Sequence, residues 1–329
     1  MATKPRVGVV GAGGLGQHHV RILGELADAT MVGFYEARAD RAAEVSAKTG
    51  ARAFDSLDAL LAETDAVTIV VPTPGHHEVA KRALERGIHV LIEKPITATL
   101  EQADELLALA RKKGALVQIG HVERFNRAIR AALPYVDGPK FIESDRLAPF
   151  NPRGSDVAVV LDLMIHDIDL ILTLVGAPVT SVAAVGVGVL TPSVDIANAR
   201  LTFGSGAVAN ITASRISRER MRKVRLFQQS GYLSLDLGAG NGEFFRLREN
   251  LDLAELAKAP LAVESFVERI ALEAPEGEPL RLEFESFVAA VRGEADVPVS
   301  GEAGRAALAV ALQIVAEIER TRPAMAAAR

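Results

Sequence analysis

Residues 6–16 read RVGVVGAGGLG, and they set the organisation of the first part of the chain. A short run of buried-strand residues leads into a glycine-rich turn, and residues 17–27 after the turn read as a helix. A strand, a glycine turn and a helix in this order are typical of the first unit of a nucleotide-binding domain. This stretch therefore predicts a parallel sheet with crossover helices.

Strands and helices continue to alternate along the first third of the chain. Further strands are predicted at 30–35, weakly near Ala53, and at 66–71, 88–92 and 115–120. Helices are predicted between them, with Ser56 and Thr99 as the caps of two. The alternation predicts a Rossmann-type, doubly wound α/β domain over residues 1–120.

The pattern changes after residue 120. Six runs follow in which polar and apolar residues alternate: 141–147, 181–190, 196–204, 207–217, 223–229 and 232–237. Such alternation is typical of a mostly antiparallel sheet with one covered face. Residues 121–329 are therefore expected to form an α+β domain, with helices at 161–174, 281–292 and 303–320.

Composition excludes several classes of function. The net charge of −5 provides no general basic field for nucleic acid, and no apolar run reaches the roughly 18 residues of a membrane span. The chain contains no cysteine, which rules out disulfides and cysteine-ligated metals. Its first residues carry no apolar signal segment. A cytoplasmic protein that binds neither nucleic acid nor membrane is expected.

Gly11, Gly13 and Gly16 form the pattern G-x-G-x-x-G between a strand and a helix. The three glycines permit a tight turn, a close approach of a pyrophosphate and close helix–strand packing. Glu36 stands twenty residues past Gly16, where a carboxylate binds both ribose hydroxyls and repels a 2′-phosphate. This favours NAD over NADP. Arg38 keeps NADP open, because a nearby arginine can accept that phosphate.

Glu93, Lys94 and Pro95 directly follow the predicted strand at 88–92. Ligands of such sheets lie beyond the carboxyl ends of the strands, so Lys94 is placed to reach the reacting end of a nicotinamide cofactor. Taken alone, the three residues favour a surface lysine before a turn proline. With the glycine pattern and Glu36 upstream, the functional interpretation is preferred.

Residues 161–174 read LDLMIHDIDLILTL, an apolar helix with several charged positions. At about 100° per residue, Asp162, His166 and Asp169 form one narrow polar stripe, whereas Asp167 lies off it and is expected to be solvated. A carboxylate one turn from a histidine can orient the ring for acid–base catalysis. A structural histidine in a core is the alternative. A metal site is disfavoured, because no second histidine stands at ligand spacing.

These motifs, in this order, resemble those of the Gfo/Idh/MocA oxidoreductases, and the resemblance covers essentially the whole chain. It implies that Lys94, Asp162 and His166 form the catalytic trio. A glutamate at position 36, where many members have aspartate, is a mild departure. The cofactor contacts that the resemblance implies are Gly11, Gly13, Gly14, Leu15, Gly16, Glu36, Arg38, Pro72, Thr73, His76, Glu93 and Lys94.

Longer stretches resemble one group in this family, the UDP-N-acetylglucosamine 3-dehydrogenases that supply 3-amino sugars for lipid A. These stretches are HVERFN, RLAPFNPRGSD, VLDLMIHDIDL, DIANARL and ANITASRISRERMRK. The resemblance implies oxidation of the sugar C3 hydroxyl to a ketone, with a partner aminotransferase acting next. The substrate contacts expected from it are Arg124, Asn126, Arg153, Asp169 and Arg215.

The run RISRERMRKVR at 215–225 is strongly basic, with six basic residues among eleven. A solvated connection between strands is the usual fate of such a run. The resemblance suggests that one or two of these side chains bind the substrate diphosphate. Two other functions stay open: a non-catalytic dinucleotide-sensing regulator, and a family member that oxidises inositol or a free hexose. A homodimer or homotetramer is expected, with the long alternating strands as its interface.

Overall fold

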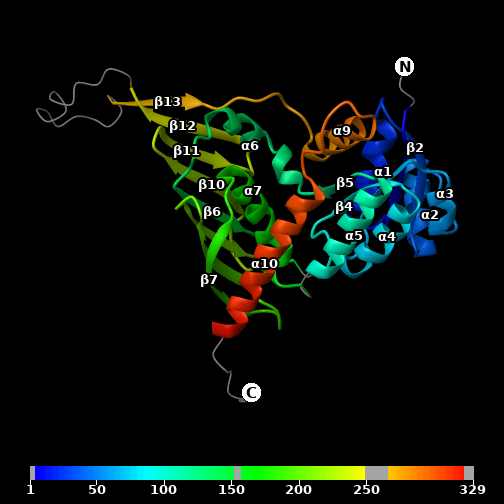
Figure 1. Cartoon of the computed structure of the whole chain (residues 1–329), viewed down its shortest axis with the longest axis horizontal. Coiled ribbons are helices and arrows are strands. Elements are labelled where there is room, and N and C mark those ends of the chain that lie inside the picture. Colours follow the sequence, from blue (N-terminus) through cyan, green and yellow to red (C-terminus); the bar gives the residue numbers. More distant parts are fainter. Residues whose placement is uncertain (1–3, 152–156, 249–265, 322–329) are drawn as a thin grey trace, which may run out of the picture. The chain divides into compact units, whose positions relative to one another are not determined.

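The computed structural model describes residues 4–151, 157–248 and 266–321 (Figure 1). The chain divides into two compact units, the first made of residues 1–125 and 277–309 and the second of residues 126–276 and 310–329. This division differs from the predicted one at residue 120, because residues 277–309 return to the first unit. There the Ile119 N–H donates to the Val299 carbonyl at 3.0 Å and extends the sheet edge.

Parallel strands form the sheet of the first unit in the order β2–β1–β3–β4–β5. They are β1 (Arg6–Val10), β2 (Thr30–Tyr35), β3 (Ala66–Ile69), β4 (His89–Glu93) and β5 (Val117–Gly120). The predicted weak strand near Ala53 is only an isolated bridge to Phe34. Strands β3 and β5 are buried along their whole length, as expected for a parallel sheet covered on both faces.

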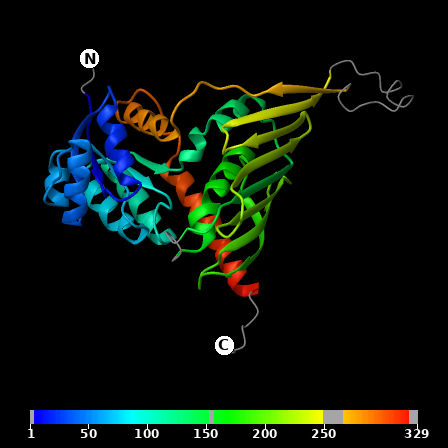
Figure 2. The same cartoon turned by 180° about the vertical axis from the view of Figure 1, so that it is seen from behind.

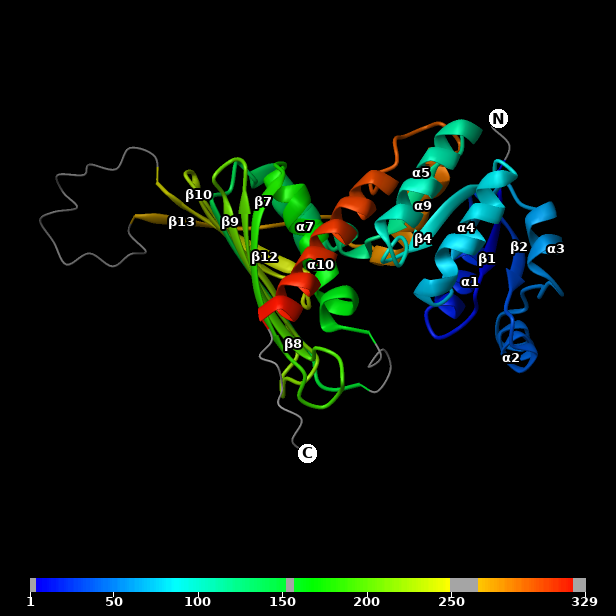
Figure 3. The ribbon, with the colours of Figure 1, turned by 60° about the horizontal axis from the view of Figure 1, so that its bottom comes forward.

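Helices cover both faces of this sheet. They are α1 (Gly16–Glu25), α2 (Ala39–Thr49), α3 (Leu57–Ala62), α4 (His76–Glu85), α5 (Leu100–Lys113) and α9 (Pro279–Val291). Helices α4 and α5 lie side by side (Figure 3). Both predicted caps are confirmed: the Ser56 and Thr99 hydroxyls accept N–H groups at 3.1 and 3.3 Å. Phe284 and Phe287 of α9 are fully buried in the core that α1 and β1 also form.

The second unit contains one large sheet in the order β13–β12–β11–β10–β6–β9–β8–β7. Its described strands pair antiparallel except for β6 with β9. They are β6 (Phe141–Leu147), β7 (Val179–Val187), β8 (Ile196–Phe203), β9 (Val208–Ser214), β10 (Met221–Gln228), β11 (Gly231–Asp236), β12 (Asn241–Leu247) and β13 (Val267–Ala271). The first six confirm predicted strands. Strands β12 and β13 were not predicted.

One face of this sheet is covered by helices (Figure 2). On β8 the alternate side chains from Ala197 to Phe203 are buried, as the period of two requires. Helices α6 (Arg127–Ala132), α7 (Ile165–Val175) and the second-unit part of α10 (Gly301–Thr321) lie on this face. Among the described residues, no helix combines the length and apolarity that crossing a membrane requires.

The opposite face carries a row of aromatic side chains across four neighbouring strands. Phe141, Phe227, Tyr232 and Phe245 stack in turn, with ring centroids 5.6, 5.4 and 4.6 Å apart. All four are half-buried, although the described helices of this unit lie on the other face. The row therefore leaves apolar surface on the uncovered side of the sheet.

Candidate active site

The glycine turn after β1 has the geometry that a dinucleotide requires. Gly11 has φ +91°, and a Cβ there would lie 2.8 Å from the Val70 carbonyl oxygen. A Cβ at Gly16 would collide with the carbonyl of Gly11, so α1 can begin close to β1 only with glycine there. A Cβ at Gly13, in contrast, would meet no atom within 4 Å. The open space at Gly13, at the N-terminus of α1, fits a pyrophosphate.

Glu36 lies against this turn, directly after β2. One carboxylate oxygen accepts the Ala12 N–H at 2.8 Å, and the other accepts the Arg38 N–H at 3.1 Å. A carboxylate offers about four acceptor positions, so capacity remains for ribose hydroxyls. The Glu36 side chain is 12% exposed, whereas that of Arg38 is 65% exposed, with its Nε 3.9 Å from the carboxylate. The acid is therefore built into the turn, and the arginine extends into solvent.

Arg41 is a residue of this site that sequence reasoning missed. Its Nε donates to the Ala12 carbonyl at 2.9 Å, and its Nη2 donates to the Gly13 carbonyl at 3.2 Å. Glu36 accepts the N–H of Ala12 and Arg41 donates to its carbonyl, so both polar backbone groups of Ala12 are bound. In the sequence, Arg41 looks like any basic residue in the first turn of a helix. Only the packing of α2 against the turn shows its role.

Glu93 ends β4 and is almost fully buried. Its Oε1 lies 3.4 Å from Nε2 of His19, and its Oε2 accepts the Lys94 N–H at 3.3 Å. Burial pushes the pKa of Glu93 up, but the neighbouring His19 and Lys94 outweigh it, so the pKa lies below its usual value. Lys94 is half-buried at the carboxyl end of the sheet, where ligands of such folds bind.

His76 joins the loop after β3 to the segment after β4. Its ring is buried, with Nδ1 2.8 Å from the Pro95 carbonyl and Nε2 2.9 Å from the Val71 carbonyl. Burial lowers the pKa of His76, although both carbonyls oppose this. Pro72 and Thr73 lie in the loop that this histidine fixes, and both keep some exposure.

In the second unit, the segment with Asp162 and His166 departs from a regular α-helix. Residues Val160–Met164 form a π-helical turn, and α7 follows from Ile165. A π-turn rotates less per residue than an α-helix, so the predicted stripe does not follow α-helical spacing at its start. Such turns occur frequently at functional sites. Asp162 and His166 are half-buried there, and Asp169 is 1% exposed.

The prediction that Asp167 is solvated is wrong. Asp167 is 2% exposed, and Arg146 of β6 binds it through Nε at 2.7 Å and Nη2 at 3.0 Å. A bidentate pair of this kind compensates the buried charges. The prediction considered only the position of Asp167 around its own helix. It could not show that Arg146, on a strand distant in sequence, pairs with it.

An arginine-rich cavity of about 200 Å³ opens beside the π-turn. Asp162 and Leu163 of the π-turn are among its lining residues. The other lining residues are Arg146, Leu147, Ala148, Pro149, Asn151, Arg215, Arg220 and Arg222. The cavity therefore combines several guanidinium groups with one carboxylate of the predicted catalytic trio.

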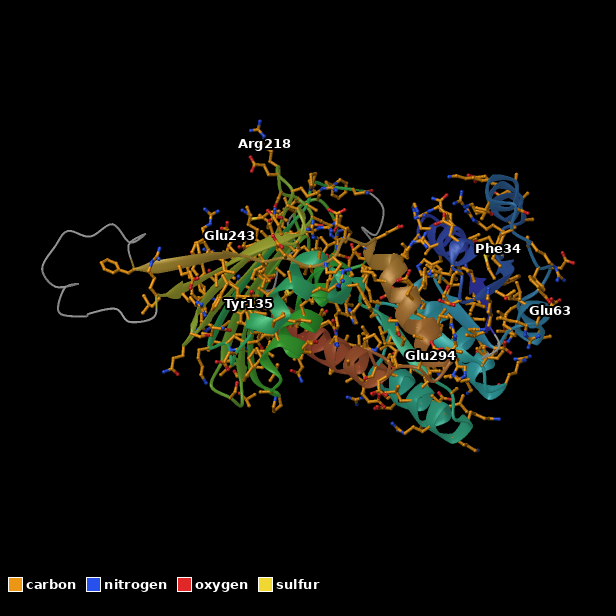
Figure 4. All side chains as sticks on the ribbon, turned by 90° about the horizontal axis from the view of Figure 1, so that it is seen from above. Phe34, Glu63, Tyr135, Arg218, Glu243 and Glu294 are labelled. Atoms are coloured by element: carbon orange, nitrogen blue, oxygen red, sulfur yellow. The ribbon has the colours of Figure 1, made fainter. Side chains whose placement is uncertain are left out.

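The basic run 215–225 divides between different surroundings. Arg222 stands opposite Arg146 in the β10–β6 register, on the cavity side, whereas Arg225 pairs with Glu143 at 2.9 Å. The side chain of Arg218 points away from the sheet (Figure 4). The sequence run therefore has no single role, because successive strand residues face opposite sides.

Arg215 is buried and also fixes the surrounding backbone. Its Nη2 donates to the Val157 carbonyl, and its Nε lies 3.9 Å from Asp195. Burial acts to raise the pKa of Asp195, but hydrogen bonds from Thr191, Val189 and Leu190 outweigh it and hold that pKa at about 2. Asp195 therefore stays ionised at neutral pH beside the guanidinium. Arg215 lies in the cavity wall, but part of its hydrogen-bonding capacity is committed to the protein.

The predicted substrate contacts Arg124 and Asn126 are not among the residues that line this cavity. Arg124 donates to the Pro298 carbonyl at 3.2 Å within the first unit. Asn126 caps α6, accepting the Ala128 N–H at 3.0 Å and donating to the Leu237 carbonyl at 2.9 Å. Arg153 is outside the described residues. Within the parts of the chain that the structure describes, no group of three or more histidine or acidic side chains could hold a metal.

Comparison with known proteins identifies the family. Residues 5–121 match the oxidoreductase family with an NAD-binding Rossmann fold, and residues 118–234 match the Gfo/Idh/MocA C-terminal domain. UDP-N-acetylglucosamine 3-dehydrogenase of Acidithiobacillus ferrooxidans is 40% identical over 95% of this chain and 97% of that protein.

Structural comparison agrees. A solved structure of UDP-N-acetylglucosamine 3-dehydrogenase from the same organism superposes with a TM-score of 0.87, covering 97% of this chain and 99% of that one. An inositol 2-dehydrogenase of Leifsonia xyli is 35% identical over 55% of this chain and 57% of that protein. The chain thus belongs to the Gfo/Idh/MocA family of NAD-binding oxidoreductases.

Proposed function

We propose that this protein oxidises the C3 hydroxyl of UDP-N-acetylglucosamine to the 3-keto sugar. The observation that supports this substrate is the cavity that Arg220 and Arg222 line together with Asp162. A nucleoside diphosphate carries the charge that such a cavity recognises, whereas inositol and free hexoses carry none. The full-length similarity to a dehydrogenase of that name supports the same substrate.

The chemistry is assigned to three residues. His166 removes the proton of the hydroxyl group, and Asp162 orients the ring and stabilises its charged form. The Lys94 ammonium donates a hydrogen bond to the same oxygen and stabilises its developing negative charge. NAD, held by the glycine turn and Glu36, supplies the hydride acceptor when bound. Asp169, buried on the same helix, is proposed as a further substrate contact.

Turnover with a panel of compounds tests this proposal. Purified protein and NAD⁺ should form NADH with UDP-N-acetylglucosamine, and UDP alone should inhibit competitively. Turnover of inositol or a free hexose without any response to UDP would instead identify another dehydrogenase of the family. NAD binding without turnover of any panel member would favour a dinucleotide-sensing regulator.

Removal of either cavity arginine is expected to weaken sugar binding. Arg220→Ala and Arg222→Ala should each raise KM for the nucleotide sugar by about ten- to a hundredfold, the usual value of a hydrogen bond to a charged group. The Kd for NAD⁺ should not change, because the glycine turn lies in the other unit. Arg225→Ala, on the opposite side of β10, is the matched control. Wild-type KM in both cavity variants would show that these arginines do not bind substrate.

Glu36 is expected to set the preference for NAD⁺ over NADP⁺. Glu36→Gln should reduce the ratio of the two kcat/KM values by about tenfold, because it removes the charge that repels a 2′-phosphate. Asp40→Asn, which removes an exposed carboxylate from the start of α2, should leave the ratio unchanged. An unchanged ratio in Glu36→Gln would assign the preference to Arg38 instead.

We also propose that the protein is a cytoplasmic homodimer or homotetramer, and that an aminotransferase consumes its product. A ketone at C3 is the group that an aminotransferase requires.

The aromatic row from Phe141 to Phe245 supplies apolar surface for an interface between copies. Light scattering should give a mass of two or four chains, and Phe227→Glu should reduce it. A monomer mass for the wild-type protein would contradict this assembly.

A further inference from the structure

Two ionisable side chains, His19 and Glu93, are buried together, and Glu93 directly precedes Lys94 in the chain. His19 of α1 is 0% exposed, and Glu93 at the end of β4 is 8% exposed. The proposed mechanism gives neither residue a role, and the family resemblance implies only a cofactor contact for Glu93. Burying ionisable groups costs free energy unless they are paired, so the arrangement needs an explanation.

The His19 ring is fixed from three elements. Its Nδ1 lies 3.2 Å from the Thr68 hydroxyl of β3, and Phe284 of α9 packs edge-on at 4.8 Å between ring centroids. Its Nε2 lies 3.4 Å from Oε1 of Glu93. The Nε2 edge of the ring therefore faces the Glu93 carboxylate at ion-pair distance, without the geometry of a hydrogen bond.

Glu93 in turn holds the main chain of Lys94. Its second oxygen accepts the Lys94 N–H at 3.3 Å, so the carboxylate lies between the imidazole and the lysine backbone. Gly120 of β5 makes room for it, because a Cβ there would lie 3.0 Å from the carboxylate carbon. On the far side of Lys94, His76 binds the Pro95 carbonyl. The segment that carries Lys94 is therefore held on both sides by buried histidine contacts.

We propose that His19 and Glu93 are positioning residues, which fix the backbone of Lys94 and place a compensating carboxylate next to it. The proposal rests on the assignment of Lys94 to the oxidation reaction. In it, His19 acts only through Glu93, and Thr68 sets the orientation of the ring.

The first test separates kcat from binding. His19→Gln is expected to lower kcat about tenfold, within the usual range for coupled neighbours, while KM for the sugar and Kd for NAD⁺ change less than threefold. The double variant His19→Gln with Glu93→Gln should be no slower than Glu93→Gln alone. His89→Gln, at the other end of β4, is the matched control. A wild-type kcat in His19→Gln, or losses that multiply in the double variant, would overturn the proposal.

The second test needs no turnover. In the protein without cofactor, the side-chain nitrogen NMR signals of His19, assigned by their loss in His19→Gln, should shift in Glu93→Gln, Lys94→Met and Thr68→Val. They should not shift in His89→Gln. His19 signals that do not shift in Glu93→Gln and Lys94→Met would overturn the proposed coupling of His19 to Glu93 and Lys94. If UDP-N-acetylglucosamine is not a substrate, the wild-type protein shows no turnover of it. The NMR shifts do not depend on turnover, so they still test the coupling between His19 and Glu93. If His19→Gln does not fold, Thr68→Val must give the same fall in kcat at unchanged Kd, or the proposal fails.

Discussion

His166→Ala is expected to slow sugar oxidation by about 10²–10⁴-fold, the usual contribution of a positioned proton transfer. The variant should still fold and bind NAD⁺ with wild-type Kd, because the glycine turn and Glu36 belong to the other unit. Single-turnover hydride transfer under saturating NAD⁺ and UDP-N-acetylglucosamine measures this loss without interference from product release.

Asp162→Asn provides the graded comparison for this prediction. It keeps the shape of the side chain and removes the charge that supports the imidazole, so it should cost less than loss of the histidine. If His166→Ala folds and transfers hydride at close to the wild-type rate, His166 is a structural histidine of the α7 segment. The proposed assignment of the general base would then be wrong.

Lys94→Ala is expected to lower kcat by about 10²–10³-fold, the loss found when one donor to a developing oxyanion is removed. Its Kd for NAD⁺ should stay close to that of the wild type, because the proposed role is in the transition state. The measurements are steady-state kinetics and NAD⁺ titration of the same preparation.

Lys81→Ala is the matched control for this variant. Lys81 lies on the surface of α4 in the same unit, where it pairs with Glu105 at 2.6 Å, and its loss should leave kcat unchanged. A wild-type kcat in Lys94→Ala would show that Lys94 is only a surface lysine before a proline. A large rise in Kd with little change in kcat would make it a cofactor ligand alone.

The strands and turns of the first unit were predictable because local signals agree there. Gly11 and Gly16 stand where backbone contacts forbid a Cβ, and Ser56 and Thr99 cap helices through hydrogen bonds within one turn. The signal near Ala53 failed, because a single bridge to Phe34 is not enough to make a strand. Local pattern therefore identified the elements that local contacts define.

The return of residues 277–309 to the first unit could not be predicted from local pattern. Helix α9 was predicted from its periodicity, but its partners are core residues of α1 and β1, more than 250 positions earlier in the chain. Strand β13 was missed for a related reason. Its five residues are half-buried or exposed at the sheet edge, so they show no apolar alternation.

The candidate site shows the same limit. Motif and spacing predicted roles for Glu36, Lys94 and the Asp162–His166 segment, because each lies in or directly after a recognisable strand or helix. The partners that come from elsewhere were not visible: Arg146 for Asp167, and Arg41 for the glycine turn. A charged residue acquires such a role only when packing brings its partner within hydrogen-bond distance.

Transfer of the C3 hydrogen is the most direct measurement of the proposed reaction. UDP-N-acetylglucosamine carrying deuterium at C3 should be oxidised by the purified protein and NAD⁺, and the NADH formed should be one mass unit heavier than NADH from the unlabelled sugar. Appearance of the label in NADH identifies C3 as the site of hydride loss. Unlabelled NADH would place the oxidation at another carbon, and no NADH from this sugar alongside turnover of inositol would contradict the proposed substrate.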